Sequence, residues 1–158
     1  MSEHKSVEPP VIAVRDAVAR ALAEDLGPLG DLTAALVWPH DSVHAEFRAR
    51  SGGVLAGRRC AEEVFAQLGA ASELVWMASD GDELSPGQLI GHVEGPLAAV
   101  LTAERSALNF LCHLSGIATL TNAFVKAASA RGHAKVWDTR KTLPGLRRNG
   151  ASHASSRS

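Results

Sequence analysis

A cationic tripeptide late in the chain has the residue types of an anion site. Arg140 and Lys141 follow Thr139 and stand just before Pro144 and Gly145. Arginine offers a planar fork of donors and lysine a compact charge, so the pair can hold the two carboxylates of a planar diacid. A bare Thr-Arg-Lys sequence is more often a solvated loop. Which interpretation holds depends on where the fold places the tripeptide.

A second cation of interest is Arg105, in the segment from Thr102 to Gly116. Thr102 can cap the N-terminus of a helix, which would place Glu104 and Arg105 in its first turn. A carboxylate is favoured there by the helix dipole and a cation is not, so Arg105 needs a reason for its position. The bare sequence leaves two explanations open, a surface arginine paired with a glutamate such as Glu104 and a ligand-binding residue.

The residues before these cations show the periods of a mixed α and β domain. Apolar residues three and four apart predict a helix from Val11 to Leu26, and Asp31 follows as a turn or cap residue. Alternation from Ser42 to Arg50 predicts a half-buried strand. Further strands are predicted at 54–56, 74–78 and 88–93, with a helix at 58–68 and a turn at 80–82. This order predicts an α+β sandwich with an antiparallel sheet.

A pair of helices and a strand are predicted next. Leu108, Leu111 and Leu114 form the apolar stripe of the first helix, Ser115 and Gly116 interrupt it, and a second helix continues towards Gly132. Residues 135–138 have the composition of a short strand. Thr139 to Lys141 would then lie at the C-terminal end of that strand, where barrel enzymes place their chemistry.

Two motifs make the chain resemble the quinolinate phosphoribosyltransferase family. They are TAERSALNFLCHLSG at 102–116 and DTRKTLPGLR at 138–147, and the Glu24–Thr33 segment is also similar to the family's N-terminal signature. The resemblance implies that Arg105, Thr139, Arg140 and Lys141 bind the substrate, and it identifies no catalytic acid or base. It also implies that Arg105 reaches across a homodimer interface into the partner's site.

The activity implied by the resemblance is phosphoribosyl transfer to the ring nitrogen of quinolinate. Phosphoribosyl pyrophosphate is the donor, and the products are nicotinate mononucleotide for NAD biosynthesis, pyrophosphate and carbon dioxide. Mg²⁺ would be bound mainly through the substrate phosphates. Two alternatives stay open: a relative of the same family associated with molybdenum transport, and an inactive remnant that only dimerises.

The domain boundaries follow from the same comparison. We expect a disordered N-terminus at 1–9, an N-terminal α+β domain at 10–115, the start of an incomplete α/β barrel at 116–147, and a disordered tail at 148–158. The family's later histidine-arginine pair and glycine-rich segments have no counterpart in this sequence. We therefore expect a truncated chain that is inactive as a fragment.

Composition excludes some other classes. A formal net charge of −1 gives no signal for nucleic acid or a membrane surface, no apolar run approaches a membrane span, and the N-terminus lacks a secretory signal, so a cytoplasmic location is expected. Cys60 and Cys112 are expected to be reduced. The close carboxylates Glu24, Asp25 and Asp31 are explained by cap and helix-surface roles. No metal site is expected, because the histidines have no ligand spacing: His40, His44, His92 and His133.

Overall fold

The computed structural model describes residues 9–38, 40–69, 71–130, 132 and 136–137. The sequence predictions for the two chain ends and for Thr139, Arg140 and Lys141 lie outside these residues. The elements, in chain order, are α1 (Val11–Leu26), the 3₁₀ turns η1 (Gly27–Leu29) and η2 (Ala34–Leu36), β1 (Ser42–Arg48), β2 (Gly53–Val54), α2 (Arg58–Gln67), β3 (Glu73–Trp76), β4 (Glu83–Leu84), β5 (Leu89–Pro96) and α3 (Leu97–Ala130).

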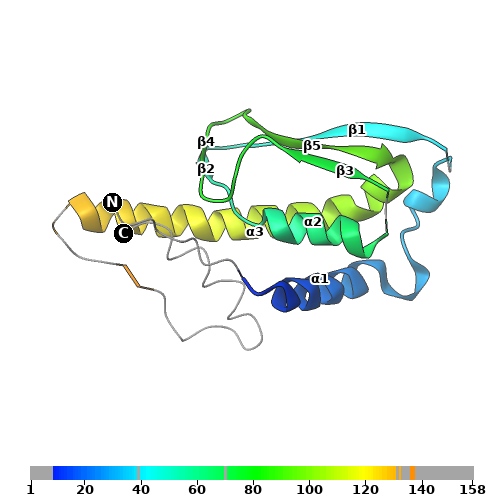
Figure 1. Ribbon diagram of the computed structural model, residues 1–158, viewed down its shortest axis with the longest axis horizontal. Coiled ribbons are helices and arrows are strands. Elements are labelled where there is room, and N and C mark those ends of the chain that lie inside the picture. Colours follow the sequence, from blue (N-terminus) through cyan, green and yellow to red (C-terminus); the bar gives the residue numbers. More distant parts are fainter. Residues whose placement is uncertain (1–8, 39, 70, 131, 133–135, 138–158) are drawn as a thin grey trace.

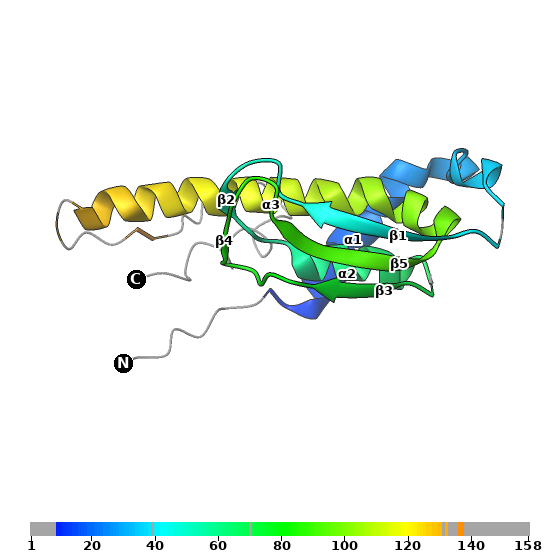
Figure 2. The ribbon, with the colours of Figure 1, turned by 90° about the horizontal axis from the view of Figure 1, so that it is seen from above.

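The main sheet is antiparallel and lies over the helices. Its strand order is β1-β5-β3, and β2 and β4 form a separate two-stranded ribbon. Helices α2 and α3 lie beneath the sheet and α1 lies on their far side (Figure 1). Seen from above, β5 runs between β1 and β3, and α3 extends past the end of the sheet (Figure 2). The predicted α+β class with an antiparallel sheet is confirmed.

The core forms where the predicted apolar faces meet. Val14, Val18 and Leu22 of α1 are buried, as their spacing predicts. Phe47 of β1 is buried, and its alternate neighbours Val43 and Ala45 pack against the same cluster. The intervening residues of β1 therefore face away from the helices, because side chains alternate across a strand.

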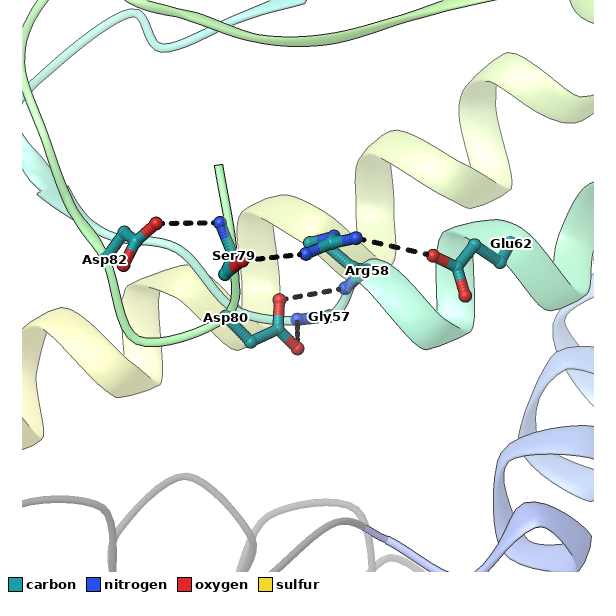
Figure 3. Close-up of polar contacts among 6 residues, drawn as sticks. All are labelled: Gly57, Arg58, Glu62, Ser79, Asp80 and Asp82. Atoms are coloured by element: carbon teal, nitrogen blue, oxygen red, sulfur yellow. Dashed lines mark hydrogen bonds and ion pairs between the residues drawn. The ribbon is translucent and has the colours of Figure 1, made fainter. Parts of the chain in front are cut away.

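The predicted turn at 80–82 fixes the start of α2. Asp80 accepts hydrogen bonds from the backbone N–H groups of Gly57 (3.1 Å) and Arg58 (3.2 Å), as Figure 3 shows. Asp82 accepts one from the Ser79 backbone at 2.8 Å, and the Arg58 guanidinium donates to the Ser79 hydroxyl at 3.2 Å. A carboxylate at the N-terminus of a helix satisfies free N–H groups and favours the dipole. Asp80 thus caps α2 from a distant part of the sequence.

Helix α3 corrects the expectation of a helix pair. It runs without interruption through Ser115 and Gly116. The Ser115 hydroxyl accepts from the Ala56 backbone N–H (3.0 Å) and lies 3.2 Å from the Ala56 carbonyl, to which it can donate. Thr119 similarly accepts from the Val54 N–H at 2.9 Å. These tertiary contacts bind the chain around β2 to α3, and they outweigh the weak helix propensity of serine and glycine.

The start of α3 also differs from the prediction. The helix begins at Leu97, so Thr102 is not its N-cap; the Thr102 hydroxyl donates to the Ala98 carbonyl at 2.9 Å instead. Glu104 and Arg105 consequently lie beyond the first turn, where the dipole has little effect on a charge. The dipole argument for a special role of Arg105 was wrong.

Two further expectations concern the region after and along α3. Val136 and Trp137 are the described residues of the strand predicted at 135–138, and neither belongs to a strand. By length and composition α3 could cross a membrane, although no such run was expected. Core helices of globular proteins meet the same criteria, and α3 buries Ala103, Ala107 and Leu111 in the core.

Candidate functional site

Arg105 is the one predicted substrate-binding residue that the described part of the chain contains. Its side chain is 72% exposed on α3. This confirms that Arg105 lies on the surface of its own chain. Its place at a dimer interface stays a prediction, and Thr139, Arg140 and Lys141 lie outside the described residues.

The exposed guanidinium of Arg105 is held by α1. Its Nη1 donates to Asp25 Oδ1 at 2.9 Å, and the Ser106 hydroxyl donates to the other oxygen, Oδ2, at 3.3 Å. The Asp25 side chain is only 18% exposed, which strengthens the contact relative to a fully solvated pair. The proposed pairing with Glu104 was therefore wrong, because Asp25 is the partner. Asp25 positions Arg105, a role that the sequence interpretation of Asp25 missed.

Asp31, which belongs to the N-terminal Glu24–Thr33 segment, lies close to Arg105. Its Oδ1 accepts from the backbone N–H groups of Thr33 (2.8 Å) and Ala34 (3.1 Å), so its predicted role as a turn and cap residue is confirmed. The Ala34 N–H is the main cause that lowers the pKa of the Asp31 carboxyl, and the Thr102 hydroxyl, the Thr33 N–H and the Arg105 cation lower it further. The single proton of the Thr102 hydroxyl can serve either Asp31 or the Ala98 carbonyl.

A surface hollow of about 350 Å³ lies between these groups. Its lining residues come from the Asp31 turn and from α3: Asp31, Thr33, Leu101, Glu104, Arg105, Leu108 and Asn109. One cation and two carboxylates give the lining a formal charge of −1. The hollow therefore favours a bound dianion only if cations outside this lining contribute to the site.

Among the described residues that line the hollow, no group of three metal-ligating side chains converges. Within the described residues, three potential metal ligands converge only at His44, His92 and Glu94, which lie on the main sheet. His44 and His92 thus lie close together in the fold although their spacing along the sequence is not that of metal ligands. Near Arg105 this chain supplies no comparable set, so no step involving Mg²⁺ can be derived from its described residues.

Comparison with known proteins extends the resemblance, which was based on two sequence motifs, over most of the chain. The family model described as quinolinate phosphoribosyl transferase, N-terminal domain, matches residues 31–115, more than half of the chain. The model of the C-terminal domain of the same family matches residues 117–153. The first motif therefore lies inside the N-terminal match except for its last residue, Gly116, and the second motif lies inside the C-terminal match.

Individual relatives agree with the family models. The quinolinate phosphoribosyltransferase [decarboxylating] 1b of Nicotiana tabacum is 39% identical over 139 residues, which make up 87% of this chain and 39% of the relative. A probable nicotinate-nucleotide pyrophosphorylase [carboxylating] of Bacillus subtilis is 41% identical over 124 residues, 78% of this chain and 42% of the relative. The chain thus spans about two fifths of the length of these relatives.

Solved structures support the same assignment. The nicotinate-nucleotide pyrophosphorylase of Francisella tularensis superposes with a TM-score of 0.88 at 35% sequence identity, over 95% of this chain and 53% of that one. The fold, the sequence match and the contact of Arg105 with the N-terminal Glu24–Thr33 segment all point to the same family. The chain belongs to the quinolinate phosphoribosyl transferase family.

Proposed function

We propose that this chain supplies the N-terminal domain and part of the substrate site of a quinolinate phosphoribosyltransferase. The reaction transfers a phosphoribosyl group from phosphoribosyl pyrophosphate to the ring nitrogen of quinolinate, with release of pyrophosphate and carbon dioxide. The observation that carries the proposal is the exposed Arg105 guanidinium, held by Asp25 at the edge of the hollow next to Asp31. The contact between Arg105 and Asp25 links the motif at 102–116 to the segment at 24–33, which also resembles the family.

Arg105 has donors left for a substrate carboxylate. A guanidinium carries five N–H groups, and the hydrogen bond to Asp25 uses one of them. Asp25 therefore fixes one side of the fork, and the remaining donors can meet a carboxylate with two parallel bonds. Arg140 and Lys141 would hold the rest of the dianion, with Thr139 beside them. Mg²⁺ would enter with the substrate phosphates and neutralise the leaving pyrophosphate.

The proposal includes a homodimer in the cytoplasm. The hollow has a formal charge of −1, so Arg105 acts on a dianion only when further cations complete the site. A second copy of the chain can supply them if Arg105 enters the site of its partner. Exposed apolar residues along α3, Leu108, Leu120 and Phe124, support burial of this helix face against another surface.

A chimaera tests the proposal, since the chain spans about two fifths of its relatives. The 124 matching residues would replace their counterpart in the Bacillus subtilis relative. Carbon dioxide release from quinolinate and phosphoribosyl pyrophosphate would then be measured with Mg²⁺. We expect turnover, and we expect Arg105→Ala to lower kcat/KM by about tenfold or more, the effect of one charge-assisted hydrogen bond.

Arg59→Ala is the matched control, because Arg59 is also an exposed arginine on a helix and lies inside the same family match as Arg105. It should leave kcat/KM unchanged. A folded, dimeric chimaera without turnover would favour the inactive remnant instead. Full activity of the Arg105→Ala chimaera would refute the assigned role of Arg105.

A further inference from the structure

The face of the main sheet that points away from the helices carries a cluster of histidine and glutamate side chains. His44 on β1 and Glu94 on β5 are in contact, with 2.8 Å between His44 Nδ1 and Glu94 Oε1. The rings of His44 and His92 are stacked, with their centroids 4.7 Å apart. One potential ligand atom from each of the three residues lies within 4.8 Å of the other two. All three side chains are exposed or half-buried, so an ion can reach them from solvent.

The strand register explains why these residues meet. His44 lies directly opposite Glu94, and Glu46 lies directly opposite His92. Residues opposite each other or two apart on one face of an antiparallel pair are close neighbours. The backbone ladder of β1 and β5 therefore holds the cluster in place, whereas the loops do not contribute to it.

A further carboxylate, Glu73, adds negative charge beside the cluster. Glu73 on β3 lies directly opposite Glu94, and like charges at such positions destabilise a sheet. Glu46 is neutralised by Arg48, whose Nε lies 2.7 Å from its Oε2. Glu73 and Glu94 thus leave negative charge beside two imidazoles, a setting in which a divalent cation is favoured.

We propose that His44, His92 and Glu94 form a surface binding site for Zn²⁺. Two imidazoles and a carboxylate are ligands that Zn²⁺ accepts, whereas Mg²⁺ prefers oxygen ligands alone. Ligand bonds of about 2.0–2.2 Å in a tetrahedron place ligand atoms about 3.3 Å apart. Exposed side chains can close from 4.8 Å to that spacing by small rotations about χ1 and χ2. Water would fill the fourth position.

The site is independent of the proposed transferase function. Arg105 lies on α3, on the opposite side of the sheet from these residues. A bound ion would link β1 to β5 through their side chains, in addition to the backbone ladder. Binding to the folded chain alone would stabilise the fold by an amount that grows with the logarithm of the free metal concentration once this exceeds the dissociation constant.

Zinc titration of the metal-free 158-residue chain tests the proposal. Calorimetry should show one Zn²⁺ bound per chain, and the thermal midpoint should rise with added Zn²⁺. His92→Gln and Glu94→Gln should each weaken binding by at least about tenfold, because each removes a ligand. His113→Gln is the matched control, since His113 is an exposed histidine on α3, and it should bind as the wild type does.

Nuclear magnetic resonance of the wild-type imidazole nitrogens gives a second measurement that needs no variant. Zn²⁺ should shift the signals of His44 and His92 and leave that of His113 in place. The proposal is overturned if those two signals do not move, if His92→Gln and Glu94→Gln bind Zn²⁺ as tightly as the wild type, or if equimolar Mg²⁺ displaces the ion.

Discussion

Replacement of Gly57 by alanine should weaken the fold by disturbing the contact between α2 and α3. Gly57 has a φ of 103° at the start of α2, a conformation that residues with a Cβ rarely adopt. An added Cβ would lie 3.1 Å from both the Phe110 carbonyl oxygen and Leu114 Cδ1. The Leu114 side chain can rotate away, but the Phe110 carbonyl belongs to the helix backbone of α3 and cannot.

Gly81 provides the matched control for the backbone effect. Its φ is 96°, and an added Cβ there would have nothing within 4 Å. The strained conformation costs about 1–3 kcal/mol at either position. Overpacking against α3 adds about 1–3 kcal/mol at Gly57 alone. We therefore expect Gly57→Ala to lower the free energy of unfolding by about 2–6 kcal/mol, against about 1–3 kcal/mol for Gly81→Ala.

Urea unfolding followed by circular dichroism would measure both free energies, provided that the transition is two-state. The difference between the two variants isolates the packing contribution, since the two glycines have similar φ angles, 103° and 96°. Equal losses within about 0.5 kcal/mol, the range of neutral surface substitutions, would show that the close approach of α2 and α3 does not constrain position 57.

Two ionisable groups give further predictions. The pKa of the Asp31 carboxyl in the folded chain lies below its ordinary value of 3.8. The ionised carboxylate therefore stabilises the fold fully above that pH, and this stabilisation is lost as the pH falls through the lower folded-state pKa. Between pH 7 and pH 3 the urea midpoint of Asp31→Asn should accordingly fall less than that of the wild type, and equal falls would contradict this. Burial, with smaller contributions from Asp80 and Glu63, raises the pKa of the Cys60 thiol to about 11. Iodoacetamide at pH 7.5 (roughly one unit below an ordinary thiol pKa) should therefore modify exposed Cys112 first, and mass spectra showing equal rates at both cysteines would refute that difference.

Local patterns were sufficient to predict most of the fold. Helix α1 and strand β1 follow from spacings of three to four and of two, which depend only on near neighbours in the sequence. Continuous α3 could not be predicted in this way. Ser115 and Thr119 are kept helical by contacts with residues near β2, about sixty positions earlier. Propensity alone favours a break there.

For the site residues, too, local properties could be predicted from the sequence, whereas contacts between distant residues could not. Exposure of Arg105 was predicted, but its partner Asp25 lies 80 positions away, and only the fold shows that the two meet. His44, His92 and Glu94 were overlooked because ligand spacing was sought along the chain. Strand alternation placed His44 on the exposed face, yet its proximity to Glu94 depends on the pairing register of β1 with β5.

The unbroken α3 sets a limit on how one chain can assemble its own substrate site. Arg105 precedes the end of the helix at Ala130 by 25 residues, so about 37 Å separates them at a rise of 1.5 Å per residue. Arg140 follows Ala130 by ten residues, which can span about 33–36 Å when fully extended. Even a fully extended return along the helix would leave the backbone of Arg140 slightly short of that of Arg105, so the two side chains would have to close the remaining distance. The length of α3 therefore adds support to the proposal that Arg105 of one subunit meets Arg140 of another.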